Sequence, residues 1–107
     1  MNFDDINFGQ RGGTYKPGLG YLLPGGYWVK KKYFEVAWKN ASENLHKLDW
    51  KFSQTAESLC GKPCWLMQSF GERIALGRCI KYFVDHEMLP LRLANPGKKG
   101  KRKYLHQ

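Results

Sequence analysis

Hydrophobic residues recur at three- and four-residue spacing in two long stretches of the chain, and this spacing predicts two amphipathic helices. The first helix is expected over about 31–48, and its apolar stripe consists of Phe34, Ala37, Trp38, Ala41, Leu45 and Leu48. The second is expected over 69–88, with a core-facing stripe formed by Leu76, Ile80, Phe83 and Val84. Ser69 and Glu72 fit the S-x-x-E capping box that begins a helix, and Pro90 prevents extension much beyond Met88.

Shorter elements are predicted around these two helices. A helix is expected over 54–60, with Ser53 as its N-cap and Gly61 ending it in a left-handed conformation. Lys62-Pro63 then forces a turn, and the apolar segment 64–68 fits either a strand or a continuation of that turn. Near the C-terminus, 91–94 and 101–105 are predicted to be two strands of a hairpin, joined by a turn over 95–100.

The first 27 residues differ from the rest because they are rich in glycine and show neither helical nor strand periodicity. We expect an ordered or half-ordered arm there, with an extended piece around residues 21–23. Its Gly18-x-Gly20 is not followed by the helix start that a phosphate-binding loop needs. The predicted organisation is therefore an arm over 1–27 and a single three-helix domain over 28–107, mainly α with a small β-hairpin. A chain of 107 residues can bury one such core.

Charge narrows the class of partner. The chain holds 18 Lys and Arg against 9 Asp and Glu, for a formal net charge of +9. From residue 91 onward every charged residue is basic, namely Arg92, Lys98, Lys99, Lys101, Arg102 and Lys103. Such a balance favours a polyanionic partner, most often nucleic acid and less often an anionic membrane or an acidic protein.

The 69–88 helix carries a second, outward side formed by Gly71, Ile74, Arg78, Lys81, Tyr82 and Asp85. A helix that enters the major groove of DNA needs a small residue near its start, a guanidinium for guanine and an apolar contact for thymine, and Gly71, Arg78 and Ile74 meet these needs. Further polar contacts to bases or phosphates are expected from Gln68, Ser69, Lys30, Lys31 and Lys32. The alternative is that this side is an ordinary solvated surface. In that case Ile74 packs against the 54–60 helix, and the charge of Asp85 would repel DNA.

The stretch from Ser53 to Leu105, with its helices in this order and the ANPGKKGKRKYL hairpin, resembles winged helix-turn-helix DNA-binding proteins. The likeness is to the small regulators, excisionases and replication-associated proteins of phages and plasmids. It implies a non-catalytic protein that places the 69–88 helix in the major groove of duplex DNA and the hairpin on the adjacent backbone. One departure is the 61–68 turn, which is longer than the usual length of about three or four residues.

Two other functions remain open from the sequence. A small basic protein with an aromatic, Gly-rich arm is also suited to bind a protein or ribonucleoprotein, for instance as an inhibitor or a subunit of a defence complex. Alternatively, the chain binds single-stranded nucleic acid or RNA, with bases stacked on Tyr15, Tyr21, Tyr27 and Trp28.

Metal and catalytic chemistry are not expected. Cys60 and Cys64 have the spacing of a ligand pair, but a second tight pair is missing, since Cys79 and His86 stand seven apart. We therefore expect three reduced thiols that pack as small hydrophobic groups, with neither metal nor cofactor. No histidine lies in a motif with a nucleophile and an orienting acid. The polar N-terminus and the absence of a long apolar run predict a cytoplasmic protein without membrane contact.

Overall fold

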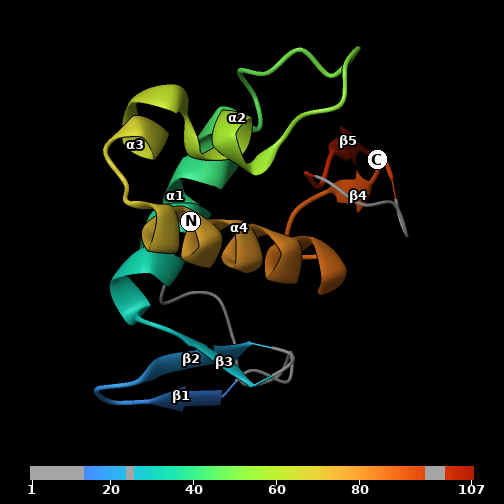
Figure 1. Cartoon of the computed structure of the whole chain (residues 1–107). Coiled ribbons are helices and arrows are strands. Elements are labelled where there is room, and N and C mark those ends of the chain that lie inside the picture. The colour runs from blue at the N-terminus through green and yellow to red at the C-terminus, as the bar shows by residue number, and fades with distance from the viewer. Residues whose placement is uncertain (1–13, 24–25, 96–100) are drawn as a thin grey trace.

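The computed structural model describes residues 14–23, 26–95 and 101–107, which form four helices and two small antiparallel sheets. The helices are α1 Lys31–Asn44, α2 Ala56–Cys60, α3 Lys62–Leu66 and α4 Phe70–Asp85. The strands are β1 Thr14–Lys16, β2 Gly20–Leu23, β3 Tyr27–Val29, β4 Leu91–Leu93 and β5 Tyr104–His106. In Figure 1, α4 crosses the middle of the molecule, with α1 behind it, α2 and α3 on one side, β1–β3 on the other, and β4–β5 beyond its C-terminal end.

The two predicted apolar stripes meet in the core, as expected. Five residues of the α1 stripe are buried, as are all four of the predicted α4 stripe: Phe34, Ala37, Trp38, Ala41, Leu45, Leu76, Ile80, Phe83 and Val84. Leu48 lies after the end of α1 and packs against the core while partly exposed. α4 buries a wider face than one stripe, because it also contacts α2, β2 and β4. Its buried face therefore includes Ala75, Cys79 and Tyr82.

The helix ends agree with the sequence in part. The capping box at the start of α4 is confirmed, with the Ser69 hydroxyl accepting from the Glu72 N–H and the Glu72 carboxylate accepting from the Ser69 N–H. Gly61 has a positive φ, of 88°, but its ψ of 132° lies outside the left-handed helical region that was expected. Three predictions of helix ends are corrected, one being that α4 ends at Asp85 and not at about Met88. The N-cap of α2 is Thr55 rather than Ser53, since its side chain accepts from the backbone of Ser58.

The third correction concerns the end of α1, which stops at Asn44 instead of running to about residue 48. There the indole N–H of Trp50 donates to the carbonyl of Leu45 at 2.8 Å. The carbonyl of Leu45, at the C-terminal end of α1, thereby gains a hydrogen bond although the helix does not continue.

The segment expected to be a turn or strand, 64–68, is instead mostly helical. α3 spans Lys62–Leu66, and the Gly61 carbonyl accepts from the N–H of Trp65 at 2.9 Å. Pro63 lies in the first turn of α3, where its missing N–H sacrifices no helical hydrogen bond. The three-helix prediction is therefore corrected to four helices.

The glycine-rich N-terminal segment is the main departure from the predicted fold class. Its described part is a three-stranded antiparallel sheet in the order β1-β2-β3, with Tyr15 opposite Tyr21 and Tyr21 opposite Val29. Tyr21, Leu23 and Val29 all belong to the buried core. The extended piece expected at 21–23 is part of β2, and the predicted boundary at residue 27 falls where β3 begins. The described part of this segment is thus a sheet that packs on the core of the domain.

The predicted C-terminal hairpin is present, although its second strand begins at Tyr104 and not at residue 101. Leu91 pairs with His106, and Leu93 pairs with Tyr104. The strand β5 also bonds to the segment before α2, because the backbones of Gln54 and Tyr104 exchange two hydrogen bonds of 2.8 and 2.7 Å. Most of the turn predicted over 95–100 lies outside the described residues.

A substitution at Gly20 tests how closely the N-terminal sheet approaches the start of α1. A Cβ at Gly20, where φ is +99°, would lie 2.0 Å from the carbonyl oxygen of Val29. Gly18 also has a positive φ, of +85°, but no atom lies within 4 Å of its would-be Cβ. We expect Gly20→Ala to lower the free energy of unfolding by more than about 2 kcal/mol and Gly18→Ala by only about 1 kcal/mol, measured by urea denaturation. Equal losses for the two variants would contradict a close backbone approach at Gly20.

Candidate nucleic-acid interface

The outward side of α4 is narrower than the sequence predicts. Gly71, Ile74, Arg78 and Asp85 are exposed, and Lys81 is half-buried. Tyr82, which was expected on this side, is only 3% exposed. Its ring stacks on His86 at 3.9 Å between centroids, and it contacts Phe34 and Phe83. The prediction that Tyr82 faces outward is wrong, because this side of α4 is also covered, with Phe34 of α1 among its contacts.

Basic side chains from α4 and from the segment before β5 meet at one pocket of about 210 Å³. Arg78 and Lys81 line it from the helix, and Arg102 lines it from the chain that leads into β5. The remaining lining residues are Leu23, Tyr82 and Asp85. The structure therefore brings together three of the predicted basic site residues, which the sequence placed on two separate elements.

The guanidinium of Arg78 is held against the N-terminal sheet. Its central carbon lies 4.2 Å from the centroid of the Tyr27 ring, at the start of β3. A cation over an aromatic face is worth about 0.5–1 kcal/mol at an exposed site, so the stack favours one position of a long, flexible side chain. This partner of Arg78 was missed from the sequence, because the two residues are half the chain apart and no local pattern joins them.

The carboxylate in the pocket is already neutralised. Asp85 forms an ion pair with Lys81, one helical turn before it on α4. Asp85 is consequently not a free negative charge on the outward side of the helix. Of the three cations that line the pocket, Lys81 is paired, and an anion that entered would meet the guanidinium groups of Arg78 and Arg102.

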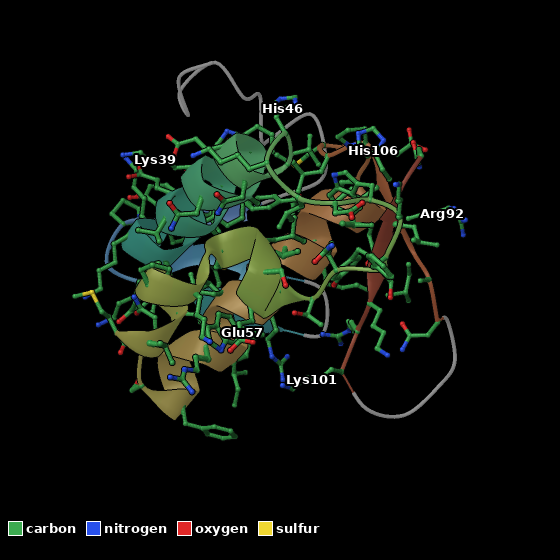
Figure 2. All side chains as sticks on the ribbon, turned by 90° about the horizontal axis from the view of Figure 1, so that it is seen from above. Lys39, His46, Glu57, Arg92, Lys101 and His106 are labelled. Carbon is green, nitrogen blue, oxygen red and sulfur yellow. The ribbon has the colours of Figure 1, made fainter. Side chains whose placement is uncertain are left out.

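Other predicted site residues surround this pocket or lie apart from it. Lys101, Lys103 and Arg92 are exposed on the hairpin segment. In Figure 2, Arg92 points outward on the side of His106, whereas Lys101 lies toward Glu57, with which it lines another pocket. Lys98 and Lys99 fall outside the described residues.

The two residues expected to meet a base or phosphate at the mouth of α4 have partners inside the protein. The Ser69 hydroxyl serves as the N-cap of α4. The amide nitrogen of Gln68 lies 3.8 Å from the sulfur of Cys64.

Lys30, Lys31 and Lys32 form a separate basic site at the start of α1. They line a pocket of about 230 Å³ with Tyr15 and the turn between β1 and β2. Lys31 pairs with Glu35 at 3.5 Å. Figure 1 shows that the start of α1 and the β4–β5 hairpin lie at opposite ends of the molecule. These lysines therefore do not join the pocket on α4.

The cysteines are placed as packing groups in the part of the chain that the structure describes. Cys60 and Cys79 are buried, and Cys64 is half-buried and accepts from the side-chain amide of Asn40 at 3.2 Å. Burial, reinforced by the neighbouring Cys64, raises the pKa of the Cys60 thiol to about 12. Burial likewise raises the pKa of Cys79. Among the described residues, no three His, Cys, Asp or Glu side chains cluster closely enough to hold a metal ion.

Comparisons of the chain with protein-family models, with curated proteins and with solved structures each found no match. None of the helices in the described ranges has the length and apolar character needed to cross a membrane.

Because of its buried thiols, we expect the protein to lose free energy of unfolding at high pH. The thiol of Cys60 stays protonated in the folded protein up to a pH of about 12, whereas the same thiol in the unfolded chain ionises near its usual pKa of 9.0. Its contribution is thus complete below about pH 9 and declines as the pH rises further, by at most about 1.4 kcal/mol per pH unit. Tyr104, whose pKa burial raises from 10.0 to about 12, adds to the decline above about pH 10.

The measurement is urea denaturation at about pH 8 and about pH 10.5. The double variant Cys60→Ala/Cys79→Ala should lose less stability between these pH values than the unmodified protein does. Cys64→Ala, which removes a half-buried thiol, controls for the loss of a cysteine as such. An unchanged pH dependence in the double variant would contradict protonated, buried thiols.

Proposed function

We propose that this chain is a non-catalytic nucleic-acid-binding protein, with duplex DNA as its ligand, and that it acts in the cytoplasm as a regulator or accessory factor of a phage, plasmid or other mobile element. The observation that carries the proposal is the pocket at which Arg78, Lys81 and Arg102 meet. A backbone phosphate is the ligand group that suits it. Guanidinium groups bind phosphate oxygens through paired N–H donors, and they do so more tightly where the side chain is already held in place.

The arrangement of elements supports the resemblance to winged-helix proteins. α4 is followed directly by the β4–β5 hairpin, and the Gln54–Tyr104 bridge attaches this hairpin to the segment between α1 and α2. In the proposed complex α4 lies along the major groove and the hairpin follows the adjacent backbone. Lys101, Lys103 and Arg92, which are exposed on the hairpin segment, add phosphate contacts outside the pocket. The helix α3 lies immediately before α4 where winged-helix proteins have a short turn, so the angle of approach is specific to this chain.

We assign Arg78 to a phosphate in preference to the guanine edge that its place on the helix first indicated. Its stack on Tyr27 and its position beside Arg102 hold the guanidinium toward the junction of α4, the sheet and the hairpin.

Binding should depend on salt and on these particular cations. Each phosphate contact on duplex DNA contributes about 0.9 to the slope of log affinity against log salt. The double variant Arg78→Ala/Arg102→Ala should therefore lower that slope by about 1.8, and it should weaken a selected site and a scrambled site equally, because phosphates are the same at both. The measurement is a fluorescence-anisotropy titration of both duplexes at several salt concentrations.

The matched control is Lys39→Ala, which removes an exposed cation from α1 on the side of the molecule away from Lys101 (Figure 2). It should change the slope much less than either single pocket variant, Arg78→Ala or Arg102→Ala, does. If Lys39→Ala weakens binding as much as Arg78→Ala, only net charge matters and the pocket is not a site. Parallel titrations with a single strand and with RNA of the same length test the choice of ligand, and tighter binding to either would contradict the assignment to duplex DNA.

A further inference from the structure

A group of large apolar side chains is exposed where α3 turns into α4. Leu66 is 60% exposed, Met67 is 84% and Phe70 is 80%, and Ile74 follows at 38%. Phe70 and Ile74 stand one turn apart on the same side of α4, and Leu66 and Met67 are adjacent at the end of α3. These four residues are called the corner patch below. Single exposed hydrophobic residues are ordinary, but a group of them on one surface marks a contact with another molecule.

The corner patch is held in a fixed shape. The Met67 N–H donates to the carbonyl of Cys64 at 3.2 Å, and the capping box fixes the first turn of α4 beneath Phe70. Arg73 connects the two helices, since its Nε donates to the carbonyl of Trp65 at 3.0 Å and its guanidinium lies over the Trp65 ring. A surface that is ordered before binding loses little conformational entropy when a partner docks, so its buried apolar area contributes more fully to affinity.

Two cations and one carboxylate of the described residues lie around the corner patch, for a net positive charge. Lys62 is exposed one turn before Leu66. The guanidinium of Arg73 lies over the ring of Trp65, the residue that precedes Leu66. The nearby acid, Glu72, is engaged at both oxygens, by the Ser69 N–H and by the Tyr33 hydroxyl, each at 2.8 Å. These hydrogen bonds, with a smaller effect of the charge on Lys32, lower the pKa of the Glu72 carboxyl. A second copy of this chain would bring like charges together across the patch, whereas an acidic partner would complement them.

We propose that the corner patch docks a second protein, one that presents an apolar recess bordered by Asp and Glu side chains. Phe70 and Met67 protrude, so they fill the recess, and Lys62 and Arg73 meet the acidic border. Aromatic and methionine side chains are enriched in such contacts, and a few central residues carry most of the affinity. The patch lies at the N-terminal end of α4, before the helical turns that hold Arg78 and Lys81. Protein docking at the patch is therefore a function separate from nucleic-acid binding at the pocket.

The test selects peptides from a displayed random library against the whole immobilised chain. We expect the enriched peptides to combine bulky apolar residues with a net negative charge. Their affinity should fall at least about tenfold for Phe70→Ser and for Met67→Ser, which is the loss typical of central interface residues. Val36→Ser removes an apolar side chain that is 36% exposed on α1, and this matched control should bind the peptides unchanged. Resynthesised peptides with their apolar residues replaced by serine should lose binding, which separates docking from attraction to a basic protein.

Duplex-DNA titration of the same variants keeps the two proposals apart. Phe70→Ser should bind DNA as the unmodified chain does, whether or not Arg78 and Arg102 prove to be phosphate contacts. The docking proposal is overturned if no peptide is enriched, if enriched peptides are neutral or basic, or if they bind Phe70→Ser as well as the unmodified chain. A loss of DNA affinity in Phe70→Ser would instead assign the patch to the nucleic-acid surface. Dimerisation that Phe70→Ser abolishes, measured by sedimentation, would assign it to a second copy.

Discussion

The side chain of Phe34 joins the layers of this protein, and the position of every candidate surface depends on the contacts it makes. Phe34 extends from α1 and is fully buried. Tyr21 of the N-terminal sheet stacks on one side of it, with 4.3 Å between ring centroids, and Phe83 of α4 meets it edge-on at 4.9 Å. Phe83 in turn packs edge-on against Trp38, one turn further along α1. Because these rings hold α4 against both α1 and β2, they fix the exposed stripe on which the basic pocket and the corner patch lie.

The sequence predicts the parts of the fold in which burial repeats with the period of a long helix. The stripes led by Phe34 and Leu76 span several turns, so their spacing is statistically clear, and Ser69 with Glu72 marks a helix start by a specific pair of hydrogen bonds. The three N-terminal strands have only three or four residues each, too few for an alternating pattern to stand out between glycines. Helical spacing also gives the wrong prediction for Tyr82, since it shows which residues share a side of α4 but not how many of its sides are covered.

The candidate site likewise has parts that the sequence predicts and parts that it does not. Composition alone identifies the basic C-terminal segment, and helical spacing places Arg78 and Lys81 on one side of α4. The spacing of Lys81 and Asp85 by one turn also permits their ion pair to be anticipated. The meeting of Arg78 with Arg102 and with Tyr27 depends on tertiary contacts between distant segments, which no local pattern contains. The sequence does not predict the corner patch, because large apolar residues such as Leu66, Met67 and Phe70 are usually buried, and only the structure shows that they are exposed.

The bridge between Gln54 and Tyr104 has a consequence for the order in which the protein folds. Its two backbone hydrogen bonds connect positions half the chain apart, so the bridge is a contact of high sequence separation, and such contacts form slowly because a long loop must close first. The contacts between α1 and α4 involve no residue beyond Asp85, whereas the buried core is completed by Leu91 and Tyr104 of the hairpin. The wall of the basic pocket that Arg102 supplies is therefore completed late in folding, together with the part of the core that Tyr104 fills.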